Sequence, residues 1–568
     1  MTLDKTMWKA LAIALESYLY GEPESKHIDA FDLPKELLQE IANQRISINH
    51  KRLQEKNKES EPEVEKKIQK VDVNSIKVIE NRSLGPEILA NDAWKQLEFE
   101  NILGECGFSS KEIALSAAVI WGRLIAPGSD LSTWRWLRKH SSLSEFFDTN
   151  ISLVHKDHIY SIADKLLKHK DKLENHLYKR QKEIFSKGDT IFLFDLTNFY
   201  FEGKCDGNKL AKRGKSKEKR SQNPLVSLAL IVDEDGFPVK SKVYQGNIGE
   251  PATLKEILDE CGLLDNKENL LSSRPILAMD RGIATKDNLE LIKSYDFPFA
   301  VIERASQTPL FKDEFIKLDS FKKIEDSKKQ IIHLKKIGNK VLCFSEAKGE
   351  KERAMRDKKE LRAQKELDTL IKSISSGRIK DSNKISERLG KIKKGCSNFN
   401  KLFTLSYDDN FKNMEYQLTN WNKELYGCYI IEYDRIDGNE SDIWHLYMTL
   451  NKVESAFRSM KTDLGTRPIY HQGAERTEAH LFLSILAYHM LRNIEVKLNI
   501  NGVNNGWSMI KNTVSTHQRT KLTWKDSNNV TWFKYCSAMP EVEQTNLYQI
   551  LKIRNPLKDH TFRQNSKM

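Results

Sequence analysis

The chain has 568 residues, too many for one hydrophobic core, so about two to four domains are expected. Lys and Arg exceed Asp and Glu by 92 to 80, and the formal net charge of +12 favours a polyanionic partner such as nucleic acid. The seven scattered cysteines form no Cys-x-x-Cys pair, which argues against a disulfide framework or a zinc site. The sequence holds neither a secretory signal nor an apolar run that could span a membrane, so a cytoplasmic protein is expected.

The first part of the chain is predicted to be helical. Residues 1–80 contain one expected helix and a charged linker, and residues 81–185 are a candidate DNA-end-binding region. Ser109 and Glu112 have the spacing of a capping box that opens a helix. The segment Trp134–Lys139 alternates aromatic and basic residues, which suits either DNA contact or the core of a helical bundle with its basic heads in solvent.

The hydrophobic period changes near residue 190, where residues 186–303 predict alternating strands and helices. The run Thr190–Asn198 has the composition of a strand buried on both faces and is interrupted by Asp195. A second short strand, Pro275–Met279, is followed directly by Asp280. A carboxylate buried without partners costs several kcal/mol, so Asp195 requires either a cation or several hydrogen-bond donors.

A basic loop is expected between the first two strands, over Gly203–Gln222. Its cations include Lys212, Arg213 and Lys215. The loop is suited to holding a phosphate backbone, although an ordinary surface loop explains its composition nearly as well. Two further strands, Leu225–Val232 and Phe237–Tyr244, are predicted to follow as a hairpin.

Residues 304–444 read as an insertion, mainly of strands, with one charged helical arm over Lys348–Gly395. The strands and helices on either side predict an α/β fold in which helices flank a mixed sheet. Residues 445–500 then complete this core, and residues 501–568 form a C-terminal region that mixes strands and helices.

One helix is predicted over Tyr447–Leu464, with an apolar face and a second, polar stripe. At 100° per residue the polar stripe contains Tyr447, Glu454, Arg458 and Lys461. Glu454 therefore lies at the border of a buried face beside two cations. Taken alone, a surface pair between Glu454 and Arg458 explains the same pattern.

The three carboxylates and this stripe together resemble the DDE-type insertion-sequence transposases, in the subgroup with a β-rich insertion before the last carboxylate. The signature of that subgroup is Tyr, two residues, Arg, three residues, Glu, six residues, Lys. Tyr447, Glu454 and Lys461 fall at those spacings, whereas Leu450 stands where the signature has Arg. Four further segments extend the resemblance: Val453–Arg458, Arg467–His471, Gly246–Asn247 and Ala278–Gly282.

The resemblance implies a ribonuclease-H-like mixed sheet, interrupted by a mainly β insertion and preceded by a helical region. It implies that Asp195, Asp280 and Glu454 hold two Mg²⁺ ions, or Mn²⁺, while Tyr447, Arg458 and Lys461 contact phosphates. The implied activity is cleavage of DNA at the terminal repeats of the element, followed by joining to target DNA. A homodimer on paired ends is implied as well.

Two other functions suit the same residues. One is a nuclease with this core that cuts DNA without joining it. The other is a transposase-derived DNA-binding protein that has lost catalytic activity. Leu450, which replaces the Arg of the signature, is the residue that suggests it.

Overall fold

The computed structural model describes residues 70–147, 149–151, 153–185, 191–214, 222–262, 264, 274–326, 328–396, 398–408, 411, 413–419 and 423–563. The helix expected near the N-terminus lies outside these residues. None of the described helices is long and apolar enough to cross a membrane.

Nine strands of the described chain form one mixed sheet, in the order β4-β3-β2-β5-β6-β12-β9-β8-β7. Their bounds are β2 Ile191–Tyr200, β3 Leu225–Asp233, β4 Pro238–Gln245, β5 Ile276–Met279, β6 Phe299–Ile302, β7 Lys322–Glu325, β8 Ile331–Ile337, β9 Lys340–Ser345 and β12 Cys428–Asp434. The strands β2, β5 and β6 run parallel, and the other pairings are antiparallel. The mixed sheet expected from the sequence is confirmed, and the expected insertion contributes β7, β8, β9 and β12 to it.

Successive side chains of β2 enter two different cores, because neighbouring residues of a strand point to opposite faces. Leu193 and Phe199 pack in the larger core, and Phe192 and Phe194 pack in the smaller one. The smaller core is closed by α9 (Leu254–Glu260) and α10 (Lys286–Ser294). On the other face lie three helices: α15 (Glu440–Met448), α16 (Asn451–Thr462) and α17 (Ala474–Ile500).

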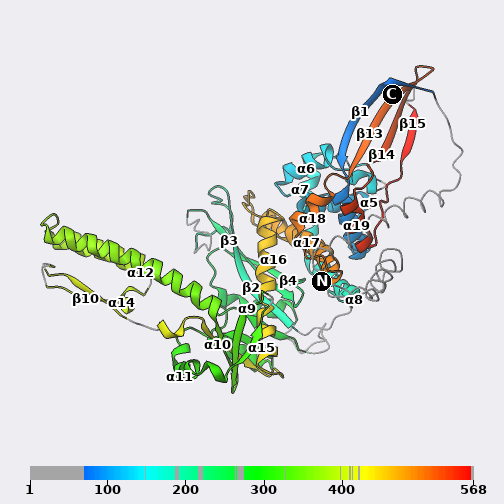
Figure 1. Ribbon diagram of the computed structural model, residues 1–568. Helices are drawn as coiled ribbons and strands as arrows, with labels where there is room; N and C mark the ends of the chain where they lie inside the picture. The colour runs from blue at the N-terminus through cyan, green and yellow to red at the C-terminus, as the bar shows by residue number, and fades with distance from the viewer. Residues whose placement is uncertain are drawn as a thin grey trace, which may run out of the picture.

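The helix α17 links the sheet to a helical body built largely from the first part of the described chain (Figure 1). Its central residues are buried on every side, as the apolar sequence predicts. The helices of the body are α3 Gly85–Gln96, α4 Phe99–Glu105, α5 Ser110–Ile125, α6 Asp130–Lys139, α7 Lys156–Lys168, α8 Lys170–Phe185, α18 Trp507–Val514 and α19 Val542–Leu551. The predicted capping box of Ser109 and Glu112 opens α5.

The aromatic and basic segment at residues 134–139 belongs to this body. The indole nitrogen of Trp134 donates to the Val154 carbonyl at 2.8 Å, and the Arg138 guanidinium lies 4.7 Å from the Trp134 ring centre. Trp136 is buried. These contacts favour the bundle-core interpretation of the segment over DNA contact.

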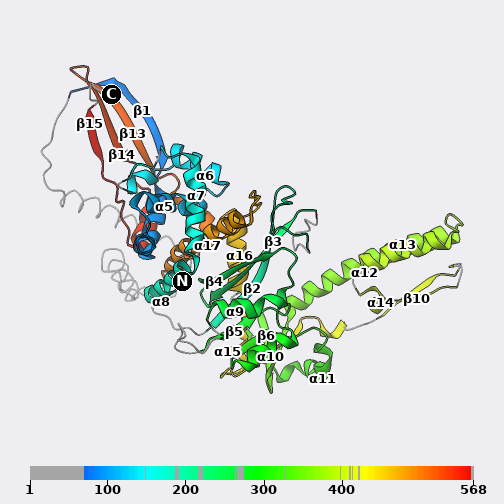
Figure 2. The same cartoon turned by 180° about the vertical axis from the view of Figure 1, so that it is seen from behind.

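A charged arm projects from the sheet (Figure 1 and Figure 2). It consists of α12 Glu346–Ser375, α13 Ser382–Gly395, α14 Phe399–Leu402, β10 Phe403–Ser406 and β11 Glu415–Leu418. The arm has a small core of its own, which includes Leu367, Leu389 and Phe403. Shorter elements complete the fold: α11 Lys312–Ile316, η2 Leu143–Phe146, η3 Glu250–Thr253, η4 Thr308–Phe311, η5 Leu318–Ser320 and η6 Lys423–Leu425. The domain boundaries expected from the sequence stay predictions.

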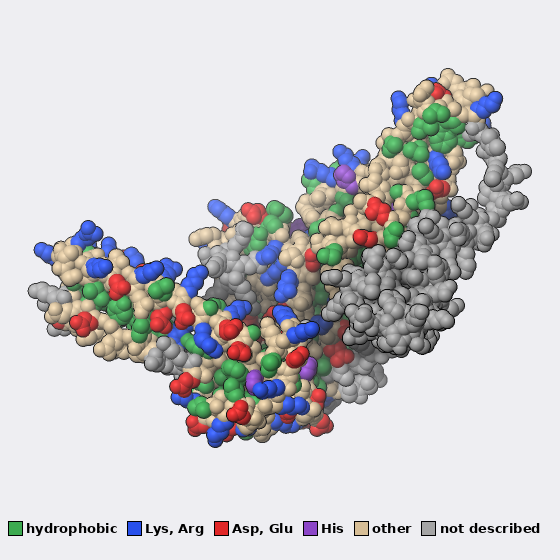
Figure 3. Space-filling model, viewed as in Figure 1, with side chains coloured by type: hydrophobic (Ala, Val, Ile, Leu, Met, Phe, Trp, Pro, Cys, Tyr) green, Lys and Arg blue, Asp and Glu red, His purple; other side chains and the backbone are tan. Residues whose placement is uncertain are grey.

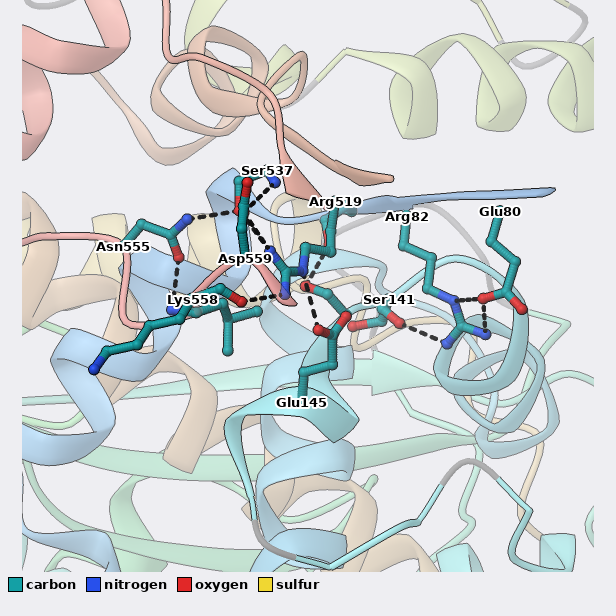
Figure 4. Close-up of polar contacts among 12 residues, drawn as sticks. Glu80, Arg82, Ser141, Glu145, Arg519, Ser537, Asn555, Lys558 and Asp559 are labelled. Atoms are coloured by element: carbon teal, nitrogen blue, oxygen red, sulfur yellow. Dashed lines mark hydrogen bonds and ion pairs between the residues drawn. The ribbon is translucent and has the colours of Figure 1, made fainter. Parts of the chain in front are cut away.

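A second, four-stranded sheet projects from the helical body, in the order β1-β13-β14-β15. Its strands are β1 Val71–Ser83, β13 Gln518–Asp526, β14 Thr531–Ser537 and β15 His560–Arg563. The buried guanidinium of Arg519 fixes the root of this sheet (Figure 4). It contacts Glu145 at 3.0 Å, Asp559 at 3.2 Å and the Lys558 carbonyl at 2.8 Å.

The single helix predicted over residues 447–464 is wrong, because the chain forms α15 and α16 with a tight turn between them. Across the turn, the Leu450 amide donates to the Tyr447 carbonyl at 3.0 Å, and the Lys452 amide donates to the Thr449 carbonyl at 2.8 Å. The Thr449 hydroxyl also donates to the Leu446 carbonyl at 2.6 Å. A Thr side chain that bonds a carbonyl of the preceding turn competes with the helical hydrogen-bond pattern.

Candidate active site

Asp195 and Asp280 follow directly on a pair of residues in two parallel strands. Phe194 of β2 pairs with Met279 of β5; Asp195 is the next residue within β2, and Asp280 is the first residue after the end of β5. Asp195 lies two residues after Leu193, and Asp280 lies two residues after Ala278. Leu193 and Ala278 both pack in the larger core, and side chains two residues apart point to the same face. The two carboxylates therefore extend from the same face of the sheet. In each, one oxygen accepts the following backbone N–H at 2.7 Å.

Glu454 comes to this face on α16, which packs against β2 and β3. The helix buries Val453, Phe457 and Met460 against the core, while Glu454 and Arg458 stay exposed. The amphipathic pattern of the sequence correctly predicted which side of α16 is buried.

Tyr447 lies within electrostatic reach of all three acidic side chains. Its side chain is 7% exposed at the end of α15. Burial raises the pKa of its hydroxyl, and the negative charges of Asp280, Glu454 and Asp195 raise it further, because each opposes a phenolate. The negative charges of two aspartates at the sheet and of a glutamate on α16 thus act together on one buried phenol.

The acidic side chains do not form a closed ligand shell. Across the residues that the structure describes, no group of three or more His, Cys, Asp or Glu side chains is arranged to hold a metal ion. The donor chemistry nevertheless suits a hard divalent cation, since all three groups offer carboxylate oxygens. For all three to share ions, their side chains would have to turn toward one another.

Lys461 points from α16 back to the sheet. Its ammonium donates to the Thr197 hydroxyl at 2.7 Å and lies 5.5 Å from the centre of the Phe199 ring. Thr197 has the same parity on β2 as Asp195, so Lys461 reaches the acidic face two residues beyond Asp195. Arg458, by contrast, remains exposed.

Leu450 stands at the signature position for Arg, and its side chain is 8% exposed within the larger core. No cation comes to the site from this position. Arg458 and Lys461 are the cations that α16 offers beyond Glu454.

The basic loop begins at the far end of β2. Lys212 exchanges both backbone hydrogen bonds with Leu225, which is also the partner of Tyr200. Five residues of strand separate Tyr200 from Asp195, or about 17 Å. The exposed side chains of Lys212 and Arg213 therefore lie away from the acidic residues, and Lys215 is outside the described residues.

The sequence did not single out Glu250, whose carboxylate approaches the loop after Asp280. A Cβ atom added to Gly282 would lie 2.3 Å from Glu250 Oε2, so a larger residue at position 282 would require the Glu250 carboxylate to shift. Gly282 ends the segment Ala278–Gly282, and Glu250 lies shortly after Gly246–Asn247; both segments carry the resemblance. Their spacing in the sequence does not reveal that the two residues approach each other.

The sequence does not single out Lys348 either, because it is one of many charged residues in the arm. Its ammonium lies 4.1 Å from the centre of the Tyr429 ring, whose hydroxyl accepts the Trp444 indole N–H at 2.8 Å. Burial lowers the pKa of Lys348, and the positive charge of Arg281, which follows Asp280, lowers it further.

A comparison with protein families agrees with this arrangement. The family described as "Transposase DDE domain" matches residues 186–490, more than half of the chain. The match spans both strands that lead to the aspartates and the helix that carries Glu454. A search among curated proteins finds no significant match. With a mixed ribonuclease-H-like sheet and this match across it, the chain belongs to the transposase DDE domain family.

Proposed function

We propose that this transposase cuts DNA at the ends of an insertion sequence and joins the resulting 3′-hydroxyls to target DNA. The observation that carries the proposal is the position of Asp195 and Asp280, each directly after the paired residues Phe194 and Met279, under the helix that bears Glu454. A phosphoryl-transfer site of this family type needs acidic oxygens from separate elements to converge.

Asp195, Asp280 and Glu454 would hold two divalent ions, Mg²⁺ or Mn²⁺. Bound ions of this kind activate the attacking oxygen and stabilise the leaving oxygen of an in-line displacement. The oxygen-only donor set favours such ions over zinc, which more often takes nitrogen or sulfur ligands in proteins.

Tyr447, Lys461 and Arg458 would orient the phosphates. The raised pKa of Tyr447 keeps its hydroxyl protonated, so it serves as a hydrogen-bond donor to a phosphate oxygen. Lys461 is held at the acidic face by Thr197, and Arg458 is free to reach DNA outside the site. Donors to phosphate fix the strand without reading its sequence.

Double-stranded DNA would extend beyond the site to two basic surfaces. One is the loop that carries Lys212, Arg213 and Lys215. The other is the arm, where α13 has five Lys and Arg residues and one Glu; Figure 3 shows many basic side chains on the arm. The proposed partners are terminal repeats and target DNA, bound by a homodimer in the cytoplasm of a bacterial or archaeal cell.

The test uses duplexes that carry the DNA flanking the gene. With Mg²⁺ or Mn²⁺, the purified protein should nick these ends, and it should join pre-cut ends to a plasmid; a chelator should stop both reactions. Nicking without joining would favour the nuclease, and binding without nicking would favour the decayed protein that Leu450 suggests. Absence of both nicking and joining, with the ends bound and metal supplied, would overturn the proposal.

A further inference from the structure

The small sheet of β1, β13, β14 and β15 carries an aromatic and basic face that the catalytic proposal does not use. Residues that pair directly across antiparallel strands share a face. Tyr535 pairs with Lys521 and with His560, and Phe533 pairs with Thr523 and with Phe562. Four aromatic side chains and Lys521 therefore lie together on one side of the sheet, which we call the ring face.

The rings of this face are closely spaced and nearly parallel. Phe533 and Phe562 have ring centres 5.4 Å apart, and those of Tyr535 and His560 are 5.0 Å apart, with 25° between the ring planes in both pairs. The Lys521 ammonium lies 5.3 Å from the Phe533 ring centre and 5.0 Å from that of Tyr535. One cation thus stands over a continuous set of aromatic surfaces.

The ring face is open to solvent along its edge. Phe562 is 40% exposed, every residue of β15 is exposed, and every residue of β14 is half-buried. In Figure 3 this sheet stands out from the helical body, with hydrophobic side chains on its surface and basic ones near its end. Exposed aromatics beside cations on a fixed projection are typical of a binding surface.

Charge decides what this surface would bind. The four strands contain seven Lys and Arg residues against three Asp and Glu residues, a surplus of four. Lys77 pairs with Thr523, and Lys525 lies two residues after Thr523 on β13. Both cations therefore point to the same side of the sheet as the ring face. Two copies of a sheet with this surplus repel each other, whereas a polyanion is attracted.

We propose that the ring face binds an unpaired DNA strand, with the rings stacking on bases and the cations of β1 and β13 contacting phosphates. In a duplex the bases stack on one another, so only an unpaired base offers its face to a side chain. This inference deepens the proposed function and rests on it, since it presumes that the chain acts on DNA. The bound DNA would be the single strand that becomes unpaired near a cut end.

The test measures binding of the full chain with Asp195→Asn, in chelator, to fluorescent oligothymidylate and to a duplex of equal length. Phe562→Leu keeps an apolar side chain but removes the ring, and should weaken single-strand binding about tenfold. Phe562→Tyr restores a ring and should restore the affinity. Lys521→Ala should reduce the slope of log affinity against log salt by about 0.7.

Lys534→Ala is the matched control, because Lys534 pairs with Leu522 on the opposite face of the same sheet. This variant should bind oligothymidylate with an affinity within about twofold of that of the parent protein. Equal single-strand affinity for Phe562→Leu and the parent would overturn the inference, as would loss of self-association with no change in DNA binding. Because the assay needs no cleavage, failure of the catalytic proposal and failure of this one give different results.

Discussion

The ammonium of Lys461 donates a hydrogen bond to the hydroxyl of Thr197 at 2.7 Å, which ties α16 to β2 two residues from Asp195. The contact fixes the position of a cation beside the acidic face. Removing this charge should slow cleavage about a hundredfold through loss of phosphate stabilisation. Lys461→Ala compared with Thr197→Val checks this, because the second variant keeps the cation and should lose far less activity in a nicking assay. Similar losses in both would assign Lys461 a structural role alone.

Asp195→Asn, Asp280→Asn and Glu454→Gln should each reduce cleavage about a thousandfold, since an amide holds a divalent ion more weakly than a carboxylate. Binding to DNA ends should change little. The control is Asp259→Asn, an exposed carboxylate on α9. Nicking of end duplexes and gel-shift binding separate the two effects. Full nicking by any of the three variants would remove that residue from the proposed site.

Leu450→Arg should destabilise the protein rather than supply the cation of the signature. Leu450 is 8% exposed in the larger core, so an arginine there would bury charge, at a cost of about 3 kcal/mol or more. Leu450→Met, which keeps the volume, should cost less than about 1.5 kcal/mol. Urea denaturation measures both variants. A stable Leu450→Arg protein with tighter binding to DNA ends would contradict this prediction.

Gly282→Ala should slow cleavage because the new Cβ would displace the Glu250 carboxylate from the loop that follows Asp280. The variant Glu250→Ala removes the same contact from the other side. If the two act through one contact, the double variant should be no slower than the slower single variant. Rates of end nicking for the three proteins test this expectation, and strictly additive losses would argue against it.

Glu87 should make stability depend on pH. Its carboxyl is fully buried in α3, and burial raises its pKa from 4.5 to about 7, although Ser141 and Ser83 both donate to it. The folded state therefore holds this proton more tightly than the unfolded state, and stability falls as pH rises from about 4.5 to 7. Above pH 7 the loss amounts to about 3 kcal/mol.

Glu87→Gln should remove this contribution, because a neutral side chain has no proton to lose. Thermal denaturation at pH 5 and pH 8 measures the effect: the variant should gain stability over the parent at pH 8 and much less at pH 5. An equal difference at both pH values would show that the carboxyl does not titrate in this range.

The two aspartates were predictable because strands leave a simple signature. A continuous apolar run tolerates a carboxylate only where something compensates it; Asp195 interrupts such a run, and Asp280 directly follows one. The register that makes them neighbours, Phe194 beside Met279, depends on tertiary pairing that spacing does not encode. Sequence thus singled out the two residues as candidates, and structure supplied their common face.

Other features had no local signal. The turn between α15 and α16 lies at Thr449, whose hydroxyl donates to the Leu446 carbonyl, although its apolar neighbours continue a helical period. The approach of Glu250 to Gly282 joins two loops that are distant in sequence. Nor does β1 show a clean alternation, because most of its residues are exposed on both faces of the strand.

The pairing of β1 with β13 joins strands from opposite ends of the described chain, with Val71 opposite Asp526. On a ribosome, β1 emerges first and must wait for nearly all the remaining polypeptide before its partner exists. Nascent chains and products of early stop codons therefore cannot complete this sheet. Only a fully translated transposase would carry the ring face.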